Sequence, residues 1–139
     1  MEKPNVLFYG DNLDVLRGRF QDGHPYISDN SIDLIYLDPP FNSNATYNAY
    51  LPEQDGTLST AQLAAFKDTW TWAEAAPTYF AFVESADVAA KARGAMVAFR
   101  GLLGDTPMLA YLSMMAPRLV ELRKKLVTVH GVKRLFFRG

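Results

Sequence analysis

The segment SIDLIYLDPPFNSNATYN, residues 31–48, contains the clearest structural signal in the chain. Its first seven residues are rich in apolar and β-branched side chains and alternate little, which is typical of a central parallel strand covered on both faces. The strand ends at Asp38, and the two prolines that follow fix φ twice and remove two amide donors. We therefore predict a buried strand over residues 31–37 that leads a carboxylate into a rigid turn.

The residues before this segment predict a strand and a helix. NVLFYG, residues 5–10, is typical of a short buried strand that ends at a glycine. DNLDVLRGRF, residues 11–20, has an acidic start and apolar residues at near-helical spacing, so we predict a short helix beginning at Asp11 or Asn12. Strand, helix and strand make a βαβ unit with a right-handed crossover, and the fold class is α/β.

The rest of the chain predicts several helices. Residues 42–56 are polar and indicate a loop, after which Ser59 or Thr60 is suited to cap a helix. Trp70 and Trp72 are expected to anchor the core. The last helix is MLAYLSMMAPRLVELRKKL, residues 108–126, whose apolar stripe we assign to the core. That stripe consists of Leu109, Leu112, Met115, Leu119, Leu122 and Leu126.

Length and composition bound the class of protein. The 139 residues suffice for one domain with a core, and 49% of them are hydrophobic. The chain has no cysteine, which excludes disulfides and thiolate sites, and its two histidines have no ligand partners at metal spacing, so we expect no metal site. We see no signal peptide and no apolar run long enough to cross a membrane, so we expect a cytoplasmic protein without membrane contact.

The charge is unevenly distributed although the net charge is only −1. Seven of the 14 lysines and arginines lie after Pro117, beside a single acid, Glu121. Such a basic end is suited to contact phosphates, and it is equally typical of a solvated helix end followed by a frayed terminus. Both interpretations stay open at this stage.

A carboxylate follows each of the two predicted strands, Asp11 after residues 5–10 and Asp38 after residues 31–37. Asp38 lies at the carboxyl end of the strand over 31–37, where open α/β sheets bind their ligands. A plain turn with an incidental acid would not explain that position. Asp11 is suited to cap the helix that begins beside it, and the residues alone leave open whether capping is its whole role.

The segments GDNLDVLRGRF (10–20), SIDLIYLDPPFNSNATYN (31–48) and FKDTWTW (66–72) closely resemble the N-terminal part of known enzymes. These enzymes are S-adenosylmethionine-dependent DNA amino-methyltransferases of restriction-modification type, in the subgroup whose catalytic DPPF motif precedes the cofactor motif. The last predicted helix also resembles the family, so the resemblance extends in patches from residue 5 to about residue 126. It implies a Rossmann-like methyltransferase fold and methylation of adenine at N6 or cytosine at N4.

The resemblance assigns catalysis to Asp38, Pro39, Pro40 and Phe41. The target amine is a poor nucleophile because its lone pair is delocalised into the base. The Asp38 carboxylate and the Pro39 carbonyl are expected to accept its two N–H groups, localise the lone pair and receive the proton. Pro40 keeps the turn rigid, and Phe41 is expected to stack on a base flipped out of the duplex.

Further roles follow from the same resemblance. Asp11 is expected beside the adenosyl part of S-adenosylmethionine, and Tyr47 is a candidate for substrate binding, although an isolated loop aromatic is also typical of packing. The implied partners are double-stranded DNA and either a restriction subunit or a missing C-terminal half.

The resemblance ends near Leu126, and the chain contains no GxG cofactor loop. We therefore divide it into residues 1–126, the N-terminal catalytic part, and residues 127–139, a divergent or frameshifted basic tail, and we expect an incomplete fold. An inactive remnant that binds nucleic acid or a partner is the main alternative. An rRNA guanine methyltransferase, which needs a glycine-rich loop before the DPPF motif, is a minor one.

Overall fold

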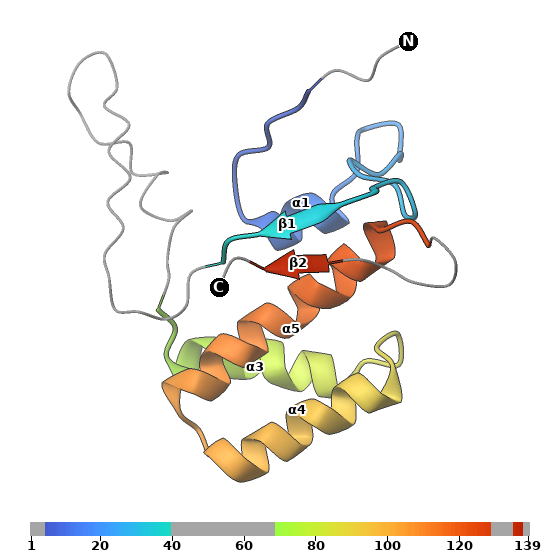
Figure 1. The fold of residues 1–139 in the computed structure, drawn as a ribbon. Coiled ribbons are helices and arrows are strands. Elements are labelled where there is room, and N and C mark those ends of the chain that lie inside the picture. The colour runs from blue at the N-terminus through green and yellow to red at the C-terminus, as the bar shows by residue number, and fades with distance from the viewer. Residues whose placement is uncertain (1–4, 40–68, 129–134, 138–139) are drawn as a thin grey trace, which may run out of the picture.

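The computed structural model describes residues 5–39, 69–128 and 135–137, and this part of the chain is mostly helical (Figure 1). The elements follow one another as α1 (Asn12–Arg17), β1 (Ile35–Leu37), α3 (Trp72–Glu84), α4 (Ala90–Leu103), α5 (Pro107–Lys125) and β2 (Leu135–Phe137). Helix α5 is the longest. It packs against α3 and α4 on one side and against α1 on the other.

The helices α3 and α5 begin at strong local signals. Thr71 and Glu74 form a capping box, in which the Glu74 amide donates to the Thr71 hydroxyl at 3.4 Å and the Thr71 amide donates to Glu74 Oε2 at 2.9 Å. Thr106 caps α5, and Pro107 occupies its first turn, where no amide donor is needed. These caps satisfy backbone donors that would otherwise face solvent or the core.

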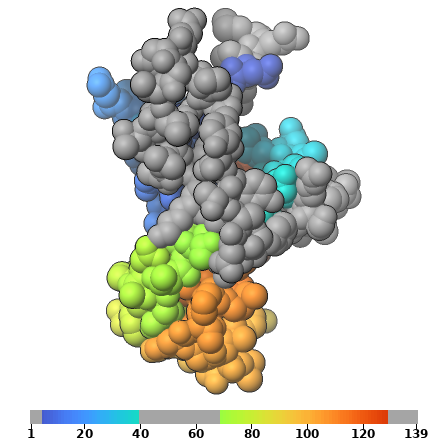
Figure 2. All heavy atoms as spheres, turned by 90° about the vertical axis from the view of Figure 1, so that its left-hand side faces the viewer, coloured from blue at the N-terminus to red at the C-terminus, as the bar shows by residue number. Residues whose placement is uncertain are grey.

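The core lies among α3, α4 and α5. Its buried side chains are Tyr79, Phe82, Val88, Met96 and Leu109. The predicted core role of Trp72 is confirmed, because its indole packs against this cluster and lies 5.5 Å from the Tyr79 ring. In the view turned by 90°, the helices α3, α4 and α5 form one lobe that lies below β1 (Figure 2).

The predicted last helix is confirmed, and its buried face differs from the predicted stripe. Leu109 and Leu126 are fully buried, whereas Met115, Leu119 and Leu122 are only half-buried. The most buried side of α5 instead carries Ser113, Pro117, Arg118, Glu121 and Lys125 in addition to Leu109 and Ala110. Polar side chains occupy this side because α1 and the loop after it supply charged partners there.

The predicted strand over residues 5–10 is wrong. These residues have no regular secondary structure, and the Leu7 side chain is 96% exposed. An isolated apolar strand gains stability only from a neighbouring strand, and among the described residues of the chain no strand is paired with this segment. The βαβ unit is therefore reduced to its helix, which begins at Asn12 as predicted, and its second strand.

The strand predicted over residues 31–37 is parallel, as expected, but short and neither central nor buried. Only Ile35–Leu37 form β1, which pairs in parallel with β2 in the register Ile35↔Leu135. Tyr36 is 63% exposed. The partner strand comes from the predicted basic tail. Ile35 and Leu37 on the other face of β1 are half-buried. The described residues therefore form a pair of short parallel strands beside a helical body rather than a Rossmann-like sheet.

The helix predicted to begin at Ser59 or Thr60 falls largely outside the described residues. Among the described helices, none combines the length and the apolar character that a membrane crossing requires.

Candidate functional site

Asp38 and Pro39 directly follow β1. The Asp38 side chain is exposed, and Pro39 is half-buried. The other residues predicted for this site, Pro40, Phe41 and Tyr47, lie outside the described residues. The described part of the chain thus places an accessible carboxylate at the carboxyl end of a parallel strand, as the sequence predicted.

Asp11 occupies the amino end of α1. Gly10 precedes it with φ at 134°, a conformation that favours glycine because a side chain there would clash with its own backbone. The Asp11 carboxylate caps α1 by accepting from the Leu13 amide at 2.7 Å. The capping role that the residues alone suggested is therefore confirmed.

The Asp11 carboxylate is also held by Arg118 of α5. Arg118 Nη2 lies 2.9 Å from Asp11 Oδ1 and 2.7 Å from Oδ2, and its Nε donates to Asn12 Oδ1 at 2.7 Å. The Arg118 side chain is only 9% exposed, whereas that of Asp11 is 47% exposed. A buried guanidinium therefore fixes a carboxylate that still faces solvent.

The two predicted site regions point to the same end of the molecule. Arg17 and Glu121 pair further along the two helices, so α1 runs in the same direction as α5. Residues 30–32 bond to the carbonyls at the carboxyl end of α5, and β1 then runs back along the helix. The amino end of α1 and the carboxyl end of β1 consequently both point away from the carboxyl end of α5 (Figure 1).

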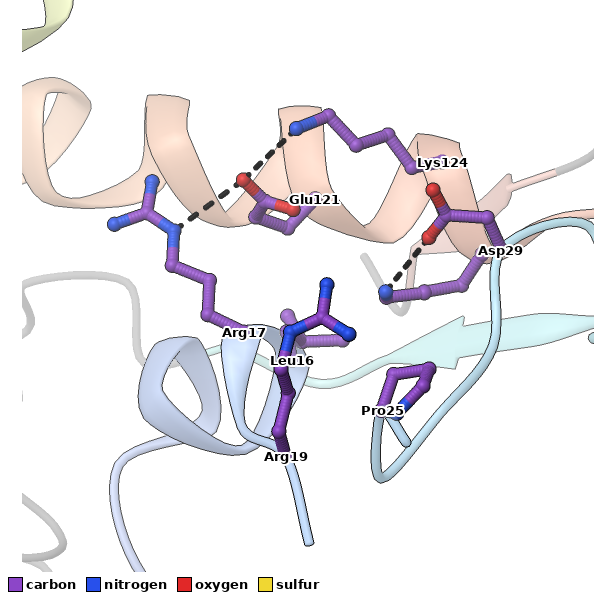
Figure 3. A pocket seen from close by; sticks show the side chains of 8 residues that line it. Leu16, Arg17, Arg19, Pro25, Asp29, Glu121 and Lys124 are labelled. Carbon is purple, nitrogen blue, oxygen red and sulfur yellow. Dashed lines mark hydrogen bonds and ion pairs between the residues drawn. The ribbon is translucent and has the colours of Figure 1, made fainter. Parts of the chain in front are cut away.

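A pocket of about 400 Å³ lies at the opposite end, between α1, the loop after it and the last turns of α5 (Figure 3). Its lining includes four cations, Arg17, Arg19, Lys124 and Lys125, and two carboxylates, Asp29 and Glu121. Dashed lines in Figure 3 mark the pairs that join them. Glu121 Oε1 accepts from Arg17 Nε at 3.3 Å and from Lys124 Nζ at 3.1 Å, and Lys125 Nζ lies 2.7 Å from Asp29 Oδ1.

These pairs explain the pocket as a contact between the helices and the loop. Three of its four cations are paired with its two carboxylates, and Arg19 donates to the Gly23 carbonyl at 2.8 Å. Cations in the last turn of a helix also compensate its negative end, so an added anion would compete with both partners. We therefore interpret the pocket as a docking contact and not as a ligand site.

Arg118 was missed by sequence reasoning as a site residue. In the sequence it belongs to the basic end, which is typical of a solvated helix end or of phosphate contacts. The structure instead pairs Arg118, Lys124 and Lys125 with acids of the same chain. The position of Arg118 directly after Pro117, within an apolar helix, is the only indication in the sequence that this arginine is special. This position does not identify a partner that lies 107 residues away.

Among the described residues, no group of three or more histidine, aspartate and glutamate side chains is arranged to hold a metal ion. No protein-family model matches the chain, and neither curated proteins nor solved structures provide a match.

Proposed function

We propose that this chain is the N-terminal catalytic part of a DNA amino-methyltransferase that modifies adenine at N6 or cytosine at N4. The observation that carries the proposal is the position of Asp38, exposed and directly after the parallel strand β1, with Pro39 next to it. Motif resemblance and this position agree. A partial Rossmann-like fold, completed by strands from another polypeptide, is part of the proposal.

The chemistry assigned to this chain concerns the target amine. Asp38 and the Pro39 carbonyl would accept its two N–H groups and draw the nitrogen toward tetrahedral geometry. After transfer the amine is cationic and strongly acidic, and Asp38 would receive its proton. Exposure of Asp38 suits this role because the base must reach it from outside, flipped out of duplex DNA.

S-adenosylmethionine would supply the electrophilic methyl group. The fit of this chain to the cofactor rests on Asp11, whose carboxylate is 47% exposed at the end of the molecule to which β1 also points. Its oxygens offer about four acceptor positions, of which the Leu13 amide and Arg118 use three. One acceptor position on Oδ2 therefore remains for a hydroxyl or amine of the adenosyl group.

Duplex DNA and a second polypeptide are the proposed partners, and the cytoplasm is the proposed location. The exposed apolar segment at residues 6–9 and the exposed Tyr36 of β1 support the need for a second polypeptide, because both would be buried in a larger parallel sheet. The same exposed surfaces favour the competing proposal of a remnant that does not catalyse.

Methyl transfer tests the proposal. The 139-residue chain is mixed with the C-terminal half of a methyltransferase of this subgroup, and transfer of radiolabelled methyl to duplex DNA is measured. We expect transfer that Asp38→Ala lowers by about 10²–10³, the usual loss for one preorganised polar group. Asp33→Ala is the matched control, since Asp33 is an exposed acid that precedes β1.

Two results would count against the proposal. Absence of transfer with every complementing half would favour the remnant. Equal transfer by the Asp38→Ala and Asp33→Ala variants would show that the turn after β1 has only a structural role.

A further inference from the structure

The arrangement around Asp11 depends on one buried side chain of α5. Arg118 contacts both Asp11 oxygens, the Asn12 side chain and the Met114 carbonyl of its own helix, the last at 2.5 Å. An arginine presents its donors in a rigid planar fork, so these four contacts fix the direction of the carboxylate as well as its position. We propose that Arg118 is a positioning residue for cofactor binding by Asp11, and this inference rests on the proposed function.

Burial makes this pair more than a surface ion pair. The Arg118 side chain is almost completely covered, and its charge is compensated mainly by Asp11. A guanidinium without that carboxylate would leave a buried charge unpaired, so the carboxylate is kept in one place. Asp11 then has two duties, since it caps α1 through Oδ1 and balances Arg118 through both oxygens.

The contacts determine which part of the carboxylate remains for a ligand. Oδ1 accepts from two donors, whereas Oδ2 accepts from Arg118 alone. The partner that fits Oδ2 is a neutral hydrogen-bond donor, such as a ribose hydroxyl or an exocyclic amine. A cationic ligand group would face the Arg118 guanidinium directly and is disfavoured.

A second ion pair between the same helices separates positioning from docking. Arg17 joins α1 to Glu121 of α5, as Arg118 joins the start of α1 to the same helix. The Arg17 side chain is half-exposed and does not contact Asp11. Replacing Arg17 thus weakens helix docking and leaves the Asp11 carboxylate held.

The test is a titration of the 139-residue chain with S-adenosylmethionine, followed by the amide NMR resonances of residues 10–12 and 35–39. Without a glycine-rich loop, we expect a Kd of about 1 mM for the wild-type chain. Arg118→Met should raise Kd about tenfold, as one lost charge-assisted hydrogen bond does. Arg17→Met should change it by less than about twofold, as for an exposed ion pair.

Arg118→Lys keeps the inference testable if Arg118→Met does not fold. A lysine retains the charge but not the planar fork, so Kd should rise about threefold with the helical circular dichroism unchanged. A Kd equal to that of the wild-type chain in a folded Arg118 variant would overturn the positioning role alone. Saturable shifts at residues 35–39 without shifts at 10–12 would also overturn it and leave the proposed function intact. A wild-type chain that shows no saturable shift would overturn both.

Discussion

The helical body formed by α3, α4 and α5 and the N-terminal region over residues 5–39 differ in how much of their apolar surface is covered. The body contains most of the buried apolar side chains, whereas Leu16 is the one large buried residue of the N-terminal region. A helix satisfies its backbone hydrogen bonds within itself and needs only side-chain packing, while a strand needs a neighbour for both. A helical unit can therefore be stable with few neighbouring elements, whereas a strand requires a paired strand.

Charged pairs and backbone hydrogen bonds join the two regions, and Leu16 adds one buried apolar side chain. Two side chains of α5 pair with acids of the N-terminal region: Arg118 with Asp11 at the start of α1, and Lys125 with Asp29 in the loop before β1. In the opposite direction, Arg17 at the end of α1 pairs with Glu121 of α5. Such pairs are specific in geometry and contribute little net free energy. The N-terminal region is therefore held mainly by polar contacts on a body that is stabilised by apolar burial.

The largest expected effect is in the helical body. Leu109 is 0% exposed in the core, so Leu109→Ala should lower the free energy of unfolding by about 2–5 kcal/mol. Urea unfolding followed by circular dichroism measures this loss. Leu102→Ala is the matched control, because Leu102 of α4 is 81% exposed and its replacement should cost less than about 0.5 kcal/mol. Equal losses for the two variants would contradict the assignment of the core.

A smaller effect is expected at the start of α3. Thr71→Ala removes the hydroxyl that accepts from the Glu74 amide at 3.4 Å and donates to Glu74 Oε2 at 2.9 Å, and this loss should cost about 1 kcal/mol. Thr71→Ser keeps the hydroxyl, so its free energy of unfolding should stay within about 0.3 kcal/mol of that of the wild-type chain. The same urea unfolding experiment applies. A loss in the serine variant as large as in the alanine variant would show that the methyl group and not the cap stabilises this end.

How much of the fold the sequence predicts follows from the same comparison. The helices at residues 12–17 and 108–125 are predicted because capping residues and helical spacing are local signals. The strand at residues 5–10 is not realised, because the apolar run NVLFYG specifies a strand only if a neighbouring strand is present. The same reasoning explains why β1 keeps its parallel pairing yet is shorter than the apolar run predicts.

The candidate site is predictable to the same extent. Asp38 after the strand and Asp11 at the helix start follow from positions next to elements that form, and the structure places both there. Arg118 could not be assigned, because its partner lies 107 positions away and a charged residue beside Pro117 gives no indication of what it contacts. Long-range pairing of charges depends on the packing of α1 on α5, which periodicity does not encode.

The smallest effect is expected in the segment whose predicted strand is wrong. Leu7 is 96% exposed and makes no core contact, so Leu7→Ser should change the free energy of unfolding by less than about 0.5 kcal/mol. The comparison with Leu109→Ala is then between the same residue type in the two regions. A loss above about 1.5 kcal/mol would mean that Leu7 is buried in solution, as expected for fully covering a leucine side chain. Residues 5–9 would then belong to a sheet formed between chains, which an increase of that loss with protein concentration would reveal. A loss independent of concentration would place the partner strand within the same chain and restore the predicted βαβ unit.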